Sequence, residues 1–176
     1  MGVKMKIFIN AGHGGLDPGA VSNYMTKEKD ITRTVAASLA AMLIEKGYNI
    51  EFFQQKENVN EVVEIEKGSS SDLFISLHCN SAANALAIGV EVLYYPTSGT
   101  GRTLAGILSK SISETLELKN RGAKPRKDLR VLNGTKAPAV LVELAFLSNL
   151  NEEQMLINKP YSFATAIMKG IEEWQK

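Results

Sequence analysis

Short apolar runs alternate along this chain with longer segments of helical period, and this alternation constrains the fold more than any other feature of the sequence. Six runs predict strands, at residues 6–10, 48–53, 72–78, 89–95, 129–132 and 139–145. Apolar residues that recur every three to four positions predict helices at residues 28–46, 103–118, 151–157 and 161–174, with a shorter one at 59–66. Strands that alternate with helices predict an α/β fold, with a largely parallel sheet and helices on both of its faces.

Length and composition bound the class of protein. A chain of 176 residues can bury a sizeable core, so we expect a single domain over residues 1–176. The net charge of +1 argues against nucleic-acid binding, which normally needs a basic face. The sequence has no run of 18 or more apolar residues, so we expect no membrane span. The N-terminus lacks an apolar segment followed by a small-residue cleavage site, so we expect no signal peptide in this chain.

Both histidines of the chain lie where an apolar strand ends. His13 lies in the glycine-rich stretch 12–15, just after the first predicted strand, and His78 closes the third. In α/β sheets, ligand sites gather at the carboxyl ends of the strands. Either histidine alone could be a hydrogen-bonded structural residue, but their shared context indicates one common site.

A metal ion is one ligand that such a pair could bind. A catalytic zinc site takes about three N or O ligands from the protein and keeps one position open for water. The single cysteine excludes an internal disulfide and a CxxC site, so two imidazoles and one carboxylate are the natural composition. Glu28, Asp17 and Asp72 are candidates for the carboxylate. Glu28 also begins a helix, where an acid complements the dipole, and we expect Thr26 or Asp30 to cap that helix. Both aspartates have turn-like surroundings, so the residues alone leave this choice open.

Glu143 interrupts a strand that is otherwise apolar, at residues 139–145. An ionised carboxylate buried without a partner costs several kcal/mol, so such residues are usually paired or functional. The alternative is an exposed position on an edge strand. Beside a metal-bound water, a carboxylate whose pKa is raised by burial is a good general base and then a good general acid.

Five cations fall within ten residues, namely Arg121, Lys124, Arg126, Lys127 and Arg130. We expect residues 119–128 to form a basic loop, and a solvated loop would explain these charges by itself. The other interpretation is a rim that holds an anionic substrate, such as one with free carboxylates.

Four blocks of the sequence resemble the zinc-dependent N-acetylmuramoyl-L-alanine amidases of the Amidase_3 type, which include autolysins, sporulation amidases and phage endolysins. The blocks are HGGLDPGA at residues 13–20, EKD at 28–30, SLHCNS at 76–81 and VELAFLSN at 142–149. They come in the order found in the family. Departures such as Asn10, where the family commonly has an aspartate, remove neither a ligand nor the catalytic acid.

The resemblance implies a zinc ion, Zn²⁺, bound by His13, Glu28 and His78, with Glu143 as the catalytic carboxylate. It also implies a twisted, mixed six-stranded sheet flanked by helices. The three ligands and Glu143 would then form one site, although they are spread over most of the chain.

The resemblance further implies a peptidoglycan hydrolase that cleaves the amide bond between N-acetylmuramic acid and the L-alanine of the stem peptide. From it we expect Asn80, Arg121, Lys124 and Arg130 to bind substrate. We expect a monomer that acts on the cell wall, outside the cell or after release by lysis. Two alternatives remain open, a related zinc peptidase that cuts a peptide bond of the stem peptide and a non-catalytic wall-binding module.

Overall fold

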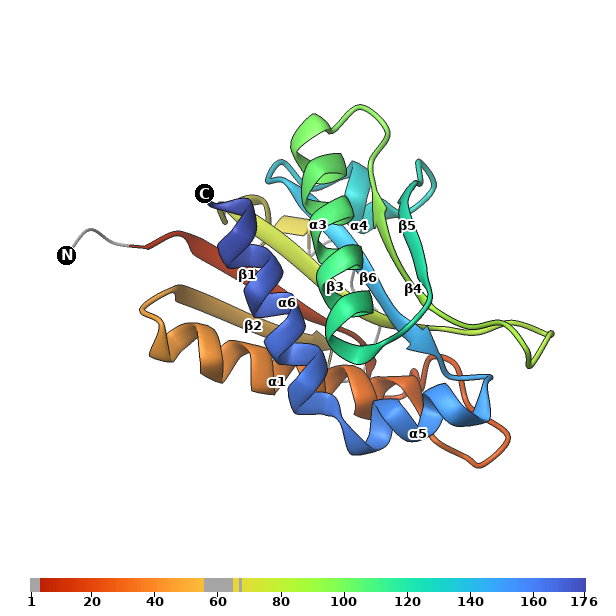
Figure 1. Cartoon of the computed structure of the whole chain (residues 1–176). Coiled ribbons are helices and arrows are strands. Elements are labelled where there is room, and N and C mark those ends of the chain that lie inside the picture. The colour runs from red at the N-terminus through yellow and green to blue at the C-terminus, as the bar shows by residue number, and fades with distance from the viewer. Residues whose placement is uncertain (1–3, 56–64, 67) are drawn as a thin grey trace.

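The computed structural model describes residues 4–55, 65–66 and 68–176. Within these ranges six strands form one twisted sheet in the order β2-β1-β3-β6-β4-β5 (Figure 1). The strands are β1 (Lys6–Gly14), β2 (Asn49–Gln55), β3 (Leu73–Asn80), β4 (Val90–Tyr94), β5 (Asn120–Pro125) and β6 (Ala139–Phe146). Neighbouring strands are parallel except β4 and β6, which are antiparallel. The prediction of a mixed, largely parallel six-stranded sheet is confirmed.

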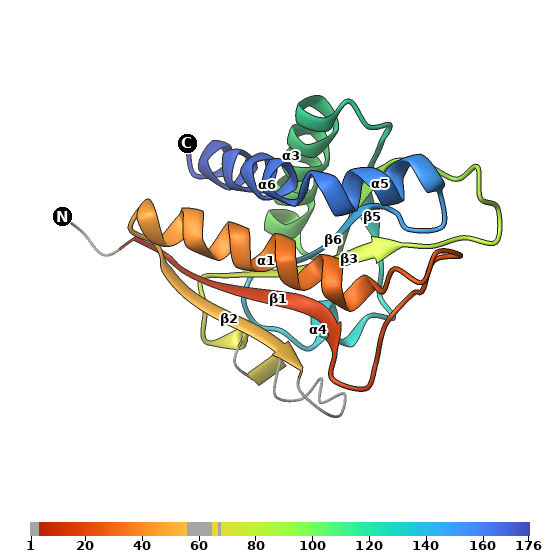
Figure 2. The same ribbon diagram turned by 90° about the horizontal axis from the view of Figure 1, so that it is seen from below.

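Three long helices cover one face of this sheet. They are α1 (Glu28–Glu45), α3 (Gly99–Leu116) and α6 (Pro160–Trp174), with α6 lying between the other two (Figure 1). The single-turn helix α4 (Arg130–Asn133) lies on the opposite face, and α5 (Leu150–Asn158) follows the carboxyl end of β6 (Figure 2). The prediction of helices on both faces is therefore correct.

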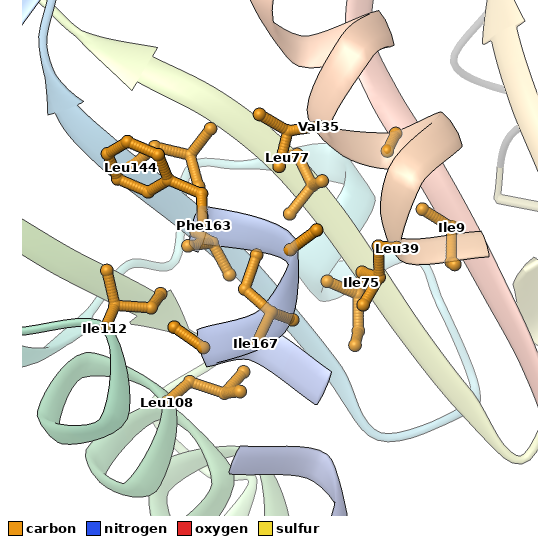
Figure 3. Close-up of a cluster of buried hydrophobic side chains, with 14 of the residues drawn as sticks. Ile9, Val35, Leu39, Ile75, Leu77, Leu108, Ile112, Leu144, Phe163 and Ile167 are labelled. Atoms are coloured by element: carbon orange, nitrogen blue, oxygen red, sulfur yellow. The ribbon is translucent and has the colours of Figure 1, made fainter. Parts of the chain in front are cut away.

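Two apolar layers separate the sheet from these helices. The larger layer packs the sheet against α1, α3 and α6, and Figure 3 labels ten of its side chains: Ile9, Val35, Leu39, Ile75, Leu77, Leu108, Ile112, Leu144, Phe163 and Ile167. The smaller layer lies on the α4 face and is formed by Phe8, Phe74, Leu93, Leu132, Ala139 and Leu141. Side chains alternate between the two faces along a strand. His78 on β3 and Glu143 on β6 therefore share the α4 face with Phe74 and Leu141.

Two predicted elements between residues 119 and 132 are wrong. Residues 120–125, expected within a loop, form the edge strand β5, and residues 129–132, expected as a strand, lie mostly in α4. An edge strand tolerates polar side chains, a glycine and a terminal proline, so β5 has no apolar alternation to reveal it. Helix α4 has four residues, which is too short for a helical period to appear in the sequence.

Two further predictions concern the start of α1 and a short helix at residues 59–66. The N-cap of α1 is Lys27, with no side-chain cap, so the prediction of Thr26 or Asp30 is wrong. Thr26 instead donates its amide to Ser22 Oγ within the preceding turn, and Asp30 lies inside the first helical turn. The predicted helix at 59–66 lies almost entirely outside the described residues.

Candidate metal centre and adjoining carboxylate

Three predicted ligands meet at the carboxyl ends of β1 and β3. His13, Glu28 and His78 each offer one ligand atom, and these atoms all lie within 4.8 Å of one another. Nε2 of His13 lies 3.2 Å from Oε2 of Glu28, and Nδ1 of His78 lies 3.0 Å from Oε1 of the same carboxylate. A set of two imidazoles and one carboxylate fits a zinc ion, which accepts N and O ligands at short distances. Among the candidate carboxylates, the geometry selects Glu28.

Glycines allow the three side chains to approach so closely. A Cβ atom at Gly12 would lie 2.4 Å from the His78 ring, and one at Gly19 would lie 2.6 Å from both Glu28 Oε2 and the His13 ring. His13 itself has a φ of 64°, a left-handed conformation that is uncommon for a residue with a side chain. Such strain occurs most often at functional sites. The glycine-rich stretch therefore turns the chain and leaves room for the ligand side chains.

Backbone amides hold the Glu28 carboxylate in place. Glu28 is the first residue of α1 and is 4% exposed. The amide of Ala20 donates to its Oε2 at 2.8 Å, and the amide of Cys79 donates to its Oε1 at 2.9 Å. Each oxygen thus receives one backbone hydrogen bond, which orients the carboxylate before any ion binds.

His13 and Glu28 have pKa values that the surrounding charges shift. Burial alone would raise the pKa of Glu28, but hydrogen bonds and charge from both histidines hold it well below its usual range. Burial alone would lower the pKa of His13, but the carboxylates of Glu28 and Asp17 outweigh it and raise this pKa from 6.5 to about 9. A metal ion would replace the proton as the positive partner of these carboxylates, because ligands bind metals in their deprotonated forms.

Asp17, which the sequence offered as a possible metal ligand or as a turn residue, contacts a proposed ligand histidine instead. Its Oδ2 lies 2.8 Å from Nδ1 of His13, and it also accepts from Gln55 Nε2 at 3.2 Å. Its other oxygen accepts from the Gly19 amide at 3.0 Å, so the turn and the histidine contact occur together. A carboxylate on the far nitrogen of a ligand histidine fixes the tautomer and the ring orientation. The spacing of four residues after His13 was the signal available in the sequence.

Glu143 lies next to this cluster, on β6. It is directly opposite His78 in the parallel β3–β6 register, and it is half-buried. Its Oε2 atom is buried and has no hydrogen-bond partner among the described residues. Burial is the largest cause that raises the pKa of Glu143, to about 7, and the charges of Glu28 and Glu91 add to this shift. A carboxylate that titrates near neutrality is well suited to take up and release a proton.

Glu91 is a second carboxylate that the sequence analysis missed. It lies opposite Glu143 in the antiparallel β4–β6 register. Its carboxylate accepts from Asn80 Nδ2 at 2.9 Å and from Arg121 Nε at 2.7 Å, and the Arg121 guanidinium lies over the Phe146 ring at 5.0 Å. In the sequence Glu91 follows a loop of small residues and lies near the start of a predicted strand, where an acid is not unusual.

The four predicted substrate-binding residues have different surroundings. Asn80 uses its amide for Glu91 and its carbonyl oxygen for the Ser81 amide, so its side chain is already engaged within the protein. Arg121 is half-buried against Glu91. Lys124 is exposed on β5, beside Leu93 of β4 in the register, and Arg130 lies at the start of α4.

A hollow of about 170 Å³ lies on the α4 face beside the cluster of His13, Glu28 and His78. It is lined by Asn10, Gly12, His13, Asp17, Gln55, His78, Leu129, Arg130, Val131 and Leu141. Of the four predicted substrate-binding residues, Arg130 lines this hollow. At its margin the buried Asn10 accepts from the Ser76 hydroxyl at 2.6 Å, while Nδ2 of Asn10 has no partner among the described residues. The hollow therefore brings together two of the proposed metal ligands, His13 and His78, with polar side chains and with apolar side chains such as Leu141.

None of the helices in residues 4–55, 65–66 and 68–176 combines the length and the apolar composition that crossing a bilayer requires.

Known proteins resemble this chain in sequence and in fold. The N-acetylmuramoyl-L-alanine amidase family profile, Amidase_3, matches residues 7–173. The uncharacterized protein YqiI of Bacillus subtilis is 33% identical over 176 residues, which cover 96% of this chain and 84% of YqiI. The probable cell wall amidase LytH of Staphylococcus aureus is 33% identical over 153 residues, which cover 85% of this chain. These residues cover 50% of LytH, so the chain spans about half the length of that relative.

Solved structures share the whole fold. An N-acetylmuramoyl-L-alanine amidase from Clostridium difficile 630 superposes with a TM-score of 0.89 at 27% identity, covering 99% of this chain and 98% of that one. The catalytic domain of the CD27L endolysin, which targets Clostridia difficile, superposes with a TM-score of 0.85 at 29% identity, covering 96% and 97% of the two chains. The profile match, which spans nearly the whole chain, shows that this protein belongs to the N-acetylmuramoyl-L-alanine amidase family.

Proposed function

We propose that this chain is a zinc-dependent N-acetylmuramoyl-L-alanine amidase. Its substrate is cell-wall peptidoglycan, and its reaction hydrolyses the amide bond between N-acetylmuramic acid and the L-alanine of the stem peptide. This proposal depends most on two features that lie side by side within the amidase fold. A cluster of His13, Glu28 and His78 that fits a metal lies beside Glu143, a carboxylate with an unpartnered buried oxygen atom.

His13, Glu28 and His78 are the proposed zinc ligands. Asp17 accepts from Nδ1 of His13 and so keeps Nε2 directed at the cluster. The Ala20 and Cys79 amides keep the Glu28 carboxylate from rotating. When bound, zinc supplies two effects, since it lowers the pKa of a bound water to about 7 and polarises a carbonyl group.

Glu143 is the proposed proton carrier. Its Oε2 takes a proton from the attacking water as the water oxygen bonds to the carbonyl carbon of the lactyl group. The same atom then gives that proton to the nitrogen of L-alanine as the C–N bond breaks. A pKa raised by burial suits Glu143 to both steps near neutral pH. The products are a free lactyl carboxylate on the sugar and a stem peptide with a new amino terminus.

The cations on the α4 face are proposed to bind the stem peptide. Arg130 lines the hollow beside the cluster, and Arg121 and Lys124 lie on β5, where Arg121 is paired with Glu91. Asn80 contributes by holding Glu91, which in turn holds Arg121. The stem peptide bears free carboxylates, so opposite charge would favour its binding over that of an uncharged peptide.

The proposed site of action is the cell wall, reached outside the cell or after lysis, and the proposed enzyme is a monomer.

Mass spectrometry of purified peptidoglycan digested with this protein tests the proposed function. We expect released stem peptides whose new amino terminus is L-alanine, together with glycan strands that carry free lactyl groups. Protein treated with a chelator should release none, and added zinc should restore the release. A new amino terminus within the stem peptide would instead identify a zinc peptidase. Binding to the wall with no released product would identify a non-catalytic module.

A further inference from the structure

Two consecutive glutamates in the first turn of α5 are buried. Glu152 is 4% exposed and Glu153 is 1% exposed. Acids in the first turn complement the helix dipole, but an exposed acid would do this equally well. Burial of a carboxylate is unfavourable unless hydrogen bonds compensate for the lost water, so the partners of each glutamate explain its position.

Glu153 binds the loop that delivers a proposed metal ligand. Its Oε1 accepts the hydroxyl of Ser22 at 2.6 Å. The Ser22 oxygen in turn accepts the amides of Tyr24 and Thr26, both at 3.1 Å, and so closes the turn of residues 22–26. Two residues after this turn comes Glu28, whose amide donates to the Ala20 carbonyl on the other side of it. Glu153 therefore ties helix α5 to the loop that leads into Glu28.

Glu152 binds the ends of the two strands that carry the other carboxylates of the site. Its Oε1 accepts the amide of Gly89 at 2.7 Å, just before β4, and its Oε2 accepts the amide of Phe146 at 2.7 Å, at the end of β6. Glu91 lies two residues after Gly89, and Glu143 lies three residues before Phe146. Glu152 thus joins β4 and β6 next to the point where Glu91 and Glu143 lie opposite each other.

We propose that Glu152 and Glu153 are positioning residues that act on different halves of the site. Glu153, through Ser22, places Glu28 in the metal centre. Glu152, through Gly89 and Phe146, places Glu143 beside it. This inference rests on the proposed function, because it assigns each glutamate to a proposed zinc ligand or proton carrier.

The two glutamates use their oxygens differently, and this difference makes the roles separable. Both oxygens of Glu152 accept from backbone amides, so an amide side chain there would direct its own N–H groups at one of those donors. Glu153 accepts a hydroxyl at one oxygen, Oε1. A glutamine at position 153 keeps that acceptor. Glu153→Gln should therefore behave like the natural protein, whereas Glu152→Gln should not.

The test measures zinc affinity and turnover separately in four variants, with Gln154→Ala, an exposed residue of the same helix, as the matched control. Zinc affinity is measured on metal-free protein by competition with a chromophoric chelator, and kcat and KM are measured at saturating zinc. We expect Glu153→Ala to weaken zinc binding by about 10–100-fold, as loss of a residue that orients a ligand commonly does. Its kcat should recover at saturating zinc, and Glu153→Gln should bind zinc like the natural protein.

Both Glu152→Ala and Glu152→Gln should keep the zinc affinity and lose kcat by about tenfold or more, since small displacements of a catalytic group are costly. Ser22→Ala removes the Glu153 hydrogen bond from its other end, and it replaces Glu153→Ala if that variant does not fold. Unchanged zinc affinity in Glu153→Ala and Ser22→Ala would overturn the inference, as would equal losses of zinc affinity in the Glu152 and Glu153 variants. If the natural protein itself binds no zinc, that result refutes the proposed function, and it is distinguishable from a failure of the positioning roles alone.

Discussion

Glu143 lies directly opposite His78 in the parallel pair of β3 and β6, with both side chains on the face that carries α4. Adjacent parallel strands are about 4.8 Å apart, so this register brings a carboxylate close to the imidazole of a proposed metal ligand without any loop. The other ligands come from a strand end and a helix start, where the chain is less regular. The sheet thus places the proposed proton carrier and one proposed ligand, whereas a strand end and a helix start place the other two.

Asp17 should matter to metal affinity because it holds His13 through Nδ1. We expect Asp17→Ala to weaken zinc binding by about 10–100-fold, as removal of a carboxylate from a ligand histidine does in other sites. Chelator competition on metal-free protein measures this change. Asp30→Asn, at an exposed position of the first turn of α1, is the control and should bind zinc normally. Normal zinc binding by Asp17→Ala would show that His13 is oriented by other groups.

Gly12 should be irreplaceable because His78 packs against its α-carbon. A methyl group there would lie 2.4 Å from the His78 ring, so Gly12→Ala should displace the ring and abolish stoichiometric zinc binding. Gly106→Ala is the matched control, since a methyl group at this exposed position on α3 meets no atom within 4 Å. The control should retain zinc and gain up to about 1 kcal/mol of stability, because alanine favours a helix. Metal analysis and thermal unfolding of both variants decide the matter, and a fully zinc-loaded Gly12→Ala protein would contradict the proposed position of His78.

The metal-free protein should lose stability in mildly alkaline solution. The pKa of His13 is raised from 6.5 to about 9 in the folded chain. A group with a raised pKa stabilises the folded state fully below its unfolded value and loses this effect as the pH rises through the folded value. The free energy of unfolding should therefore fall by roughly 3 kcal/mol between pH 6.5 and 9.

Urea unfolding of chelator-treated protein at several pH values measures this loss. His13→Gln is the control, because without the imidazole the decline over this pH range should largely disappear. Saturating zinc should also reverse the trend, since zinc binds the deprotonated ligands and its affinity rises with pH. A metal-free protein that is equally stable at pH 6.5 and 9 would refute the predicted coupling of His13 with Glu28.

Much of the fold could be predicted because its central strands are buried on both faces. The strands at residues 72–78 and 139–145 are nearly continuous apolar runs, and the single acid in the second run marks Glu143. The edge strand β5 and the single-turn helix α4 could not be predicted. A solvent-exposed edge strand does not need alternating apolar residues, and a helix of one turn is too short to show a helical period. The basic residues fall in these elements, so the surroundings of Lys124 and Arg130 were the least predictable part of the site.

The carboxylate ligand of the proposed zinc site could not be identified from residue types and spacing alone. Two histidines at strand ends indicate a site, but Glu28 and Asp17 both lie within fifteen residues of His13, and spacing does not separate them. The resemblance to the amidases favoured Glu28, and the structure places its carboxylate between the two imidazoles. Glu91, Glu152 and Glu153 could not be found from the sequence, because their partners lie on other strands and loops and depend on the tertiary fold.

His13, Glu28 and His78 are proposed to hold zinc while Glu143 moves the proton. Zinc content and amidase turnover of Glu143→Gln, measured on the same preparation, test it most directly. The substitution keeps the shape of the side chain and removes its ability to take a proton. We predict one zinc per chain, unchanged thermal unfolding and a loss of turnover of about 10²–10⁴-fold, the usual contribution of a general acid–base group. Turnover equal to that of the natural protein, or loss of the zinc, would contradict this account.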